Sequence, residues 1–328
     1  MRSWRPSPSS PGCTETLTRL DETGAHVVAV AARSVEALRD GLRGPAYLPS
    51  DAGYRRARRG SPGTTPVDNR HPALVVEPET AEDVARTIEF AHTQHLDLSV
   101  RSGGHDALAA STTHDGVLVD LGRMAGVRLD PRTGVATAGA GVRSGALVAV
   151  AADADRAAIG GMNPNVGLGG VTLGGGIGWL CGTHGATVDT LLAVEIVTVD
   201  GRRLNVDARH NAELFWALRG GGGNFGVATS FTYQLPPARP VTAGMIGYEV
   251  NATKFLTFVR DILADSPDAL DIAAGVSFES APRSYLRVCW SGDAALGERV
   301  LRPLRTFAPP IFDTIERQSY AGFSSTSP

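Results

Sequence analysis

The chain has 328 residues, of which 42% are hydrophobic and 20% are charged, as expected for a folded globular protein with more than one subdomain. Its formal net charge of −3 gives no electrostatic reason to expect a nucleic acid or an anionic membrane as a partner. No apolar run approaches the length of a membrane span, and three widely spaced cysteines argue against a disulfide framework or a metal site. A cytoplasmic location is expected, with secretion as the alternative because the chain begins with basic residues.

The predicted elements alternate between strands and helices as far as residue 235. After a loose tail, a short helix is expected over 34–43, and the arginines at 55, 56, 58 and 59 are interpreted as an exposed helix face. A further helix begins at Thr80, with Asp83 as its capping-box partner. Strands are predicted at 73–78, 96–100, 116–121, 135–141 and 227–235, helices at 144–154 and 211–226, and a hairpin at 191–206 that turns at Asp200-Gly201.

Three prolines, Pro236, Pro237 and Pro240, mark a domain boundary. Beyond them the pattern changes to that of an antiparallel sheet with helices. The predicted elements there are strands at 241–250, 270–279 and 284–290 and helices at 253–264 and 293–306. The predicted domains are an N-terminal tail and helix over 1–44, a central domain over 45–238 and a partial second domain over 239–328.

The segment 160–178, GGMNPNVGLGGVTLGGGIG, holds nine glycines in nineteen residues. Glycine costs folding entropy, and a tight buried turn needs only two or three glycines. Successive exposed amide groups can surround a diphosphate without any side chain. The segment therefore predicts a phosphate-bearing ligand held by the backbone.

Two common nucleotide sites fit this chain poorly. An ATP or GTP loop requires a lysine after its glycines, and the only lysine is Lys254, far along the chain. A dinucleotide fingerprint has one variant match, GAGVRSG at 139–145. Its acidic residue should end the next strand, but that position falls in the glycine-rich segment.

The sequence RSGGH, at 101–105, places a histidine directly after a strand and a double-glycine turn. The glycines would let the backbone turn against a ligand, with His105 beside it. A lone histidine is more often a satisfied polar residue, but no other histidine has this setting. His92 and His95 share a helix without an acid or cysteine to complete a metal set, so they are interpreted as surface residues.

Taken in order, ALVVEP, the capped helix, RSGGH, the segment 160–180 and ELFWALRGGGGNFGV at 213–227 resemble the berberine bridge enzyme-like branch of FAD-linked oxidases. The resemblance covers about residues 45–305. It implies an α+β fold: an FAD-binding domain of the p-cresol methylhydroxylase (PCMH, or vanillyl-alcohol oxidase) type, made of two α/β subdomains, plus a partial antiparallel-sheet substrate domain.

In that family the histidine of the RSGGH turn bonds to the 8α-methyl group of FAD, which implies a covalent link through His105 here. A second covalent site, a cysteine in many members, is Asn163 in this chain, so a single link is expected. The cofactor-binding residues implied by the resemblance are Arg101, Ser102, Gly103, Gly104, His105, Asp106, Asn163, Val166, Gly167, Gly169, Gly170, Gly174, Gly175, Gly176, Gly178 and Val227.

Three further features bear on activity. Members usually have a glycine shortly after the histidine, where this chain has DALAAST at 106–112. A small residue at Val166 resembles members in which O2 reaches the flavin, although simple packing is the alternative. Family chains also continue well past the last residue here, and the part that is missing usually carries the catalytic base. The last ten residues, SYAGFSSTSP, are interpreted as a diverging low-complexity end.

The main functional hypothesis is therefore an FAD-dependent oxidase that moves a hydride from an alcohol or amine carbon to covalently bound FAD, with O2 as the acceptor. The alternatives are a catalytically silent flavin-binding remnant and a dehydrogenase with another acceptor. The partners expected are a small-molecule substrate and O2. No catalytic base is assigned, because none can be placed beside the reacting proton. The substrate and the oligomeric state stay open.

Overall fold

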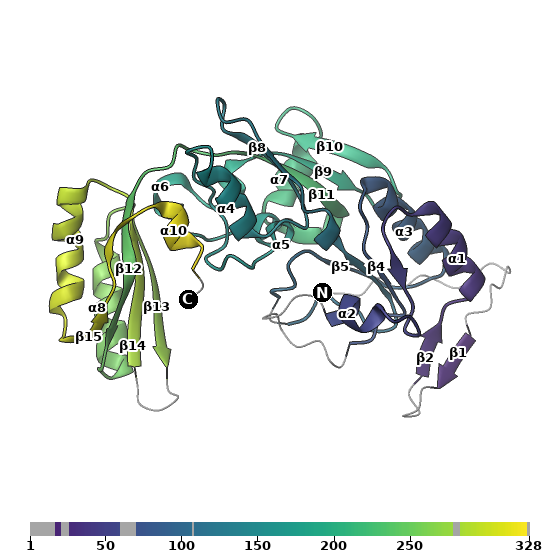
Figure 1. The fold of residues 1–328 in the computed structure, drawn as a ribbon, viewed down its shortest axis with the longest axis horizontal. Coiled ribbons are helices and arrows are strands. Elements are labelled where there is room, and N and C mark those ends of the chain that lie inside the picture. The colour runs from purple at the N-terminus through teal and green to yellow at the C-terminus, as the bar shows by residue number, and fades with distance from the viewer. Residues whose placement is uncertain (1–16, 21–25, 60–69, 107, 278–282, 327–328) are drawn as a thin grey trace.

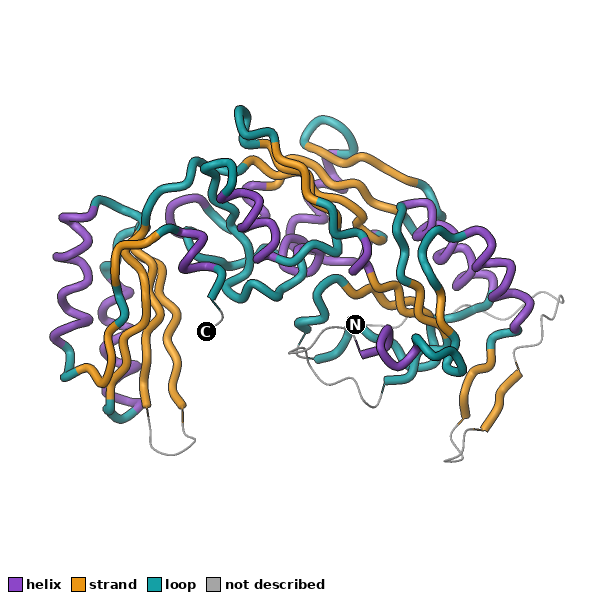
Figure 2. Tube along the Cα trace, in the orientation of Figure 1, coloured by secondary structure: helices purple, strands orange, loops and turns teal. Residues whose placement is uncertain are grey.

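The computed structural model describes residues 17–20, 26–59, 70–106, 108–277 and 283–326, which form three sheets laid out as an arch (Figure 1). At the centre of the arch, loops and short helices lie between the strands and the hollow (Figure 2). A separate hairpin pairs β1 (Leu17–Leu20) with β2 (His26–Ala29), so the expected loose tail contains a strand at its end. No helix in the described ranges has the length and apolar character of a membrane span.

The first sheet has the strand order β3-β4-β6-β5, and its three main strands run parallel. Its strands are β3 (Ala46–Tyr47), β4 (Leu74–Val76), β5 (Leu98–Arg101) and β6 (Val117–Asp120), and its helices are α1 (Ala32–Gly41), α2 (Tyr54–Arg59) and α3 (Ala81–Thr93), with a 3₁₀ turn η1 (Leu121–Arg123) after β6. Buried Val35 and Leu38 of α1 share a core with β4 and α3. Helix α1 therefore packs as part of this unit.

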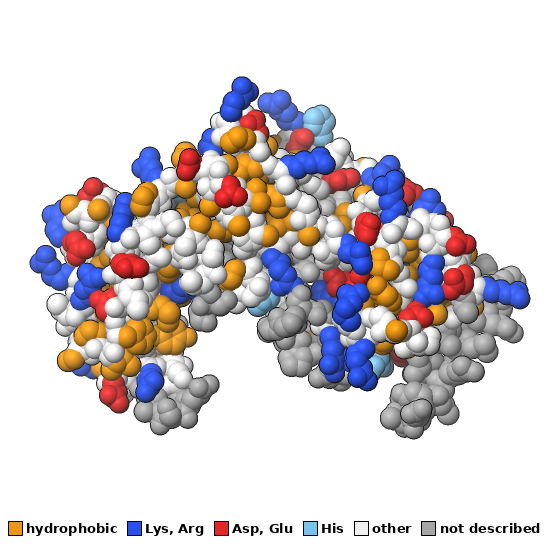
Figure 3. All heavy atoms as spheres, viewed as in Figure 1, with side chains coloured by type: hydrophobic (Ala, Val, Ile, Leu, Met, Phe, Trp, Pro, Cys, Tyr) orange, Lys and Arg blue, Asp and Glu red, His pale blue; other side chains and the backbone are white. Residues whose placement is uncertain are grey.

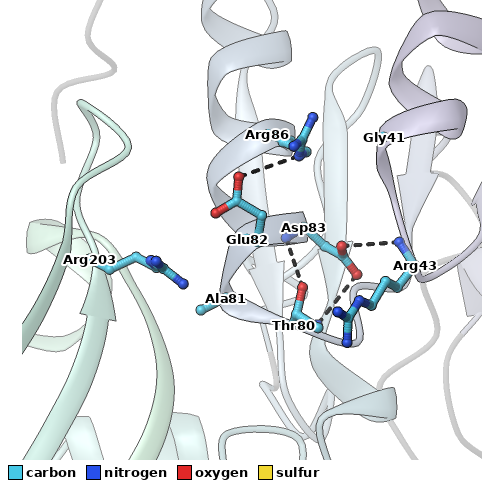
Figure 4. Close-up of a pocket in the computed structure, with 8 residues that line it drawn as sticks. All are labelled: Gly41, Arg43, Thr80, Ala81, Glu82, Asp83, Arg86 and Arg203. Atoms are coloured by element: carbon cyan, nitrogen blue, oxygen red, sulfur yellow. Dashed lines mark hydrogen bonds and ion pairs between the residues drawn. The ribbon is translucent and has the colours of Figure 1, made fainter.

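Helix α3 begins where the capping box predicts. The Thr80 side chain accepts a hydrogen bond from the backbone N–H of Asp83, and the Asp83 carboxylate accepts one from the backbone N–H of Thr80, as Figure 4 shows. The Asp83 carboxylate also accepts backbone N–H bonds from Arg43 and Gly44, which ties the end of α1 to the start of α3. The pocket around this helix N-terminus has a volume of about 410 Å³ and is lined by Arg43, Arg86 and Arg203, but the N-terminus is already capped by the protein.

The second sheet is antiparallel, with the order β10-β9-β11-β8-β7. Its strands are β7 (Val127–Leu129), β8 (Val135–Gly139), β9 (Leu191–Val197), β10 (Arg203–Asp207) and β11 (Val227–Gln234). The elements packed around it are α4 (Ser144–Ala152), α5 (Leu168–Leu173), α6 (Cys181–His184), η2 (Thr187–Thr190), α7 (Ala212–Gly221) and η3 (Gly222–Phe225). The hairpin between β9 and β10 turns at Gly201, whose φ is +77°, as predicted.

The third sheet, order β13-β14-β12-β15 with β16 also on β12, is antiparallel. Its elements are β12 (Val241–Tyr248), α8 (Ala252–Ala264), β13 (Leu270–Ser277), β14 (Arg283–Trp290), α9 (Ala294–Thr306), β15 (Pro310–Asp313) and β16 (Glu316–Gln318). Helices α8 and α9 cover one face through a core that includes Tyr248, Phe255 and Leu301. The other face borders the hollow of the arch (Figure 1).

Two predictions made from the sequence are corrected. The expected low-complexity end instead forms α10 (Tyr320–Ser324), whose Tyr320 and Phe323 are buried against Trp179. In the arginine cluster, Arg55, Arg56 and Arg59 are exposed as expected, but Arg58 is buried and donates to the carbonyl of Arg70. Both errors arise because the burial depends on partners distant in the sequence.

Candidate functional site

The two glycine segments identified from the sequence touch each other directly. A Cβ on Gly103 would overlap the backbone of Gly167, and a Cβ on Gly167 would overlap the backbone of Gly103. Ser102 strengthens this contact, since its hydroxyl donates to the Ala140 carbonyl at 2.5 Å and accepts from the Gly169 amide at 3.2 Å. The RSGGH turn after β5 and the start of α5 therefore form one backbone-built junction between the first and second sheets.

Internal packing explains more of these glycines than the sequence argument allowed. In the segment 160–178, a Cβ would press on neighbouring protein atoms at seven of the nine glycines: 160, 161, 167, 169, 174, 176 and 178. The expectation that structure needs only two or three glycines is therefore wrong. Gly170 and Gly175 are different, because a Cβ would meet no atom within 4 Å at either position.

Open glycines also occur in the later segment GGGGNFG. Gly222 and Gly223 of η3 likewise have no atom within 4 Å of a built Cβ, and η3 packs beside α5. Two neighbouring stretches of backbone thus leave room that no described protein atom uses. Val227 follows directly, buried at the start of β11. This unfilled space is what a backbone-bound ligand would need.

The side chains of Arg101 and Asp106 are used within the protein. Arg101 is 3% exposed, pairs with Asp120 at 2.6 Å and donates to the carbonyls of Ala57 and Arg58. The Asp106 carboxylate accepts N–H bonds from Leu108, Ala110 and Ser111, which closes the loop after the histidine. Both side chains are thus already bonded within the protein.

The His105 side chain differs from those of Arg101 and Asp106, because no described residue bonds it. It follows Gly104, whose φ of +72° turns the chain in a way that favours glycine, and its side chain is partly exposed. None of the described residues forms a hydrogen bond with its imidazole, although the side chains on either side of the turn are bonded. The ring is thus available for a partner outside the described protein.

The remaining predicted residues cluster around the same junction. Asn163 forms a local turn in which its Oδ1 accepts from the Asn165 amide at 2.9 Å. Val166 packs on Gly161, and its carbonyl accepts from the Ser144 amide at the start of α4. The packing role of Val166 that was left as an alternative is thus present. The GAGVRSG segment also has a structural explanation, because Gly139 and Gly141 lie against the carbonyls of Met124 and Leu121.

A cavity of about 430 Å³ opens beside the junction, lined by Ser102 and Gly103 and by the chain leading into α4. Its charged lining residues are Arg56, Glu77, Arg101, Asp120, Arg123 and Arg143. Glu77 is bonded by Arg56 and Arg123 at 2.9 Å each. Burial disfavours the charged form of Glu77, but the two arginines outweigh burial and lower its pKa.

Except for Arg101, none of these charged residues was predicted from the sequence to contact a ligand. A signal was present, since Glu77, Ser102 and Asp120 lie at the carboxyl ends of three parallel strands, where ligands of such sheets commonly bind. The cluster holds no metal set: no described group of three His, Cys, Asp or Glu side chains is arranged to hold a metal ion.

Comparison with known proteins decides the family. Residues 72–207 match the FAD binding domain family. The (R)-6-hydroxynicotine oxidase of Paenarthrobacter nicotinovorans is 33% identical over 290 residues, which are 85% of this chain and 62% of that protein. The chain belongs to the berberine bridge enzyme-like FAD-linked oxidases. The resemblance seen in the sequence and the expected α+β fold are confirmed.

Solved structures of FAD-linked oxidases agree. That of 6-hydroxy-D-nicotine oxidase from Arthrobacter nicotinovorans matches with a TM-score of 0.81 at 31% identity, covering 87% of this chain and 63% of that one. Physcomitrella patens BBE-like 1 matches with a TM-score of 0.77 at 25% identity, covering 85% of this chain and 61% of that one. The chain therefore spans less than two thirds of each of these relatives. The open glycine backbone and the unbonded His105 fit an FAD.

Proposed function

We propose that this chain binds FAD covalently through His105 alone and forms the cofactor-binding part of an oxidase. The observation that carries the proposal is the imidazole of His105, which no described residue bonds, at the end of a turn whose glycine touches the second glycine segment. Asn163, at the position of the second link in many relatives, has an amide side chain that cannot act as a thiolate nucleophile. The residues expected to hold the cofactor are those of the two segments, mostly through backbone N–H groups.

Bound FAD would supply a two-electron acceptor that takes a hydride from an alcohol or amine carbon and is restored by O2. The protein's own part would be to orient the cofactor at the glycine junction, where a substrate would reach it from the hollow of the arch. Val166 is proposed to leave room for O2 there. We expect flavin re-oxidation by O2 to be slower in Val166→Leu than in wild type. Because Val166 also packs on Gly161, the two rates are compared only if the variant has an unchanged thermal unfolding curve.

The experiment is to express the chain with FAD supplied, precipitate it with acid, and measure flavin in the pellet by absorbance and peptide mass spectrometry. Wild type and His92→Ala, whose histidine is exposed on α3, should retain flavin, whereas His105→Ala should retain none. Equal retention in the two variants, or a flavin peptide lacking His105, would overturn the proposal. Retained flavin that no alcohol or amine reduces would instead support a catalytically silent flavin-binding protein.

A further inference from the structure

One row of residues crosses the third sheet on the face that borders the hollow. Cross-strand pairing aligns Gly275 with Tyr285, Tyr285 with Gly247, and Gly247 with Phe312, so glycine and aromatic residues alternate over four strands. Residues directly opposite each other in antiparallel strands point to the same face. This is the face away from α8 and α9, because the neighbouring Ile246 and Leu286 lie in the core beneath those helices.

The glycines let the two rings lie flat. A Cβ on Gly275 would overlap the Tyr285 ring, and a Cβ on Gly247 would overlap the Phe312 ring. Phe312 is 40% exposed and Tyr285 is partly exposed, so neither ring is covered by the described protein. Figure 3 shows hydrophobic side chains gathered over the β12–β14 sheet where it borders the hollow. We call Gly275, Tyr285, Gly247 and Phe312 the aromatic row.

The aromatic row belongs to the same surface as the glycine segment. Ala243, four residues before Gly247 on β12, packs with Trp179, which directly follows Gly178. Four strand residues span roughly 13 Å, so the row lies about that far from the chain that ends the glycine segment. Between them lie Met245, Arg287 and Ala273, and the guanidinium of buried Arg287 is bonded to the carbonyls of Phe323 and Thr326.

We propose that the aromatic row is a stacking surface for a flat aromatic ring of the substrate. The inference rests on the proposed FAD function, which places the substrate in the hollow. Flat rings favour offset stacking with flat rings. A polyhydroxylated ring would need several hydrogen-bonding groups, whereas the Tyr285 hydroxyl is the only polar side-chain group in the row. The alternative is that the Tyr285 and Phe312 rings serve only to shield the glycine backbone from water, in which case they would bind no ligand.

The test is saturation-transfer NMR on the flavin-loaded chain with three probes: 2-naphthol, its saturated and puckered counterpart decahydro-2-naphthol, and xylobiose. Wild type should bind 2-naphthol most tightly. The double variant Tyr285→Leu, Phe312→Leu keeps apolar cover over the glycines and should weaken 2-naphthol binding about tenfold. Trp216→Leu, which removes a 71% exposed aromatic ring on α7, is the matched control and should bind as wild type does.

A second variant guards against misfolding of the first. Gly275→Ala keeps both aromatic residues but displaces the Tyr285 ring, so it should also weaken 2-naphthol binding. Equal binding of 2-naphthol and decahydro-2-naphthol, tighter binding of xylobiose, or unchanged binding in both row variants would overturn the proposal. Acid-stable flavin is measured on the same samples: its absence in wild type refutes the FAD proposal, whereas its presence with no 2-naphthol binding refutes the stacking surface alone.

Discussion

Two junctions hold distant parts of this chain together, and they are built in opposite ways. At Gly103 and Gly167 the chains meet because side chains are absent. At the seam formed by Trp179, Arg287 and Phe323 they meet through large side chains, with the Arg287 guanidinium 5.0 Å from one ring and 4.6 Å from the other. The first lies beside the open space at Gly170 and Gly175, whereas the second is filled by its own side chains. A ligand is expected at the glycine junction, whereas the seam serves stability.

The seam also anchors the end of the described chain. Tyr320 donates from its hydroxyl to the Ala158 carbonyl at 2.9 Å, and Arg287 donates to the carbonyls of Phe323 and Thr326 at 2.8 Å each. Burying each aromatic side chain is worth about 2 kcal/mol. Helix α10 is thereby held over the chain that follows the glycine segment. The two junctions should respond differently to small and large substitutions.

The largest effect is expected for Gly167→Ala. The added methyl group would meet the backbone of Gly103, which cannot rotate away, and the Ser102 hydroxyl, which two hydrogen bonds hold in place. We expect a loss of about 3 kcal/mol of unfolding free energy. Urea unfolding of the flavin-free chain measures it. Gly126→Ala is the control, because no atom lies within 4 Å of a Cβ there; equal losses in the two variants would show that the close approach does not matter.

Arg287→Leu should cost about 2 kcal/mol, because it removes a buried hydrogen bond to the Phe323 carbonyl and a second bond to the carbonyl of the exposed Thr326. The effect should be local, so hydrogen exchange should accelerate in 320–326 more than in the first sheet. Arg299→Leu, at an exposed position on α9, is the control. Uniform acceleration throughout the chain, or none in α10, would contradict the proposed anchoring.

The sequence allowed prediction of what local chemistry determines. Thr80 and Asp83 cap α3, Asp200-Gly201 turns the hairpin, and the strand and helix order agrees with the structure. It did not predict the burial of Tyr320 and Phe323, because their partners, such as Ala158 and Trp179, are distant in the sequence. Within the site, the glycine count indicated a backbone surface. Only the fold separates glycines that the protein fills from those that it leaves open.

A pH effect is expected at Glu77. Its folded-state pKa lies below the usual 4.5, since burial is outweighed by the two arginine bonds. Such a carboxylate stabilises the fold above its unfolded pKa, and the contribution disappears as pH falls through the folded value. We expect about 1 kcal/mol, because Arg56 and Arg123 are 62% and 44% exposed and solvent screens them.

Urea unfolding of wild type and Glu77→Gln measures this contribution. The difference between them should be present near neutral pH and shrink as pH drops below about 4.5. Glu298→Gln, at a 67% exposed carboxylate, should show a smaller difference at every pH. A gap between wild type and Glu77→Gln that stays constant on acidification would show that the arginine bonds do not stabilise the charged carboxylate.

The smallest expected effect is a gain, and it falls in the loop after His105. Ala109 has a φ of +54°, a left-handed conformation that costs an alanine about 1 kcal/mol and a glycine little. Ala109→Gly should therefore raise the unfolding free energy by about 0.5 kcal/mol, after the extra entropy of glycine in the unfolded chain. Ala110, next in the chain, has no positive φ, so Ala110→Gly should lower stability instead. The Ala109 methyl group is buried and that of Ala110 is exposed, so loss of burial alone would make Ala109→Gly the more damaging change. A gain at Ala109 can therefore arise only from its backbone conformation. If the two variants shift the unfolding midpoint in the same direction, the loop does not hold Ala109 left-handed in solution, and the Asp106 bonds that close it are not maintained.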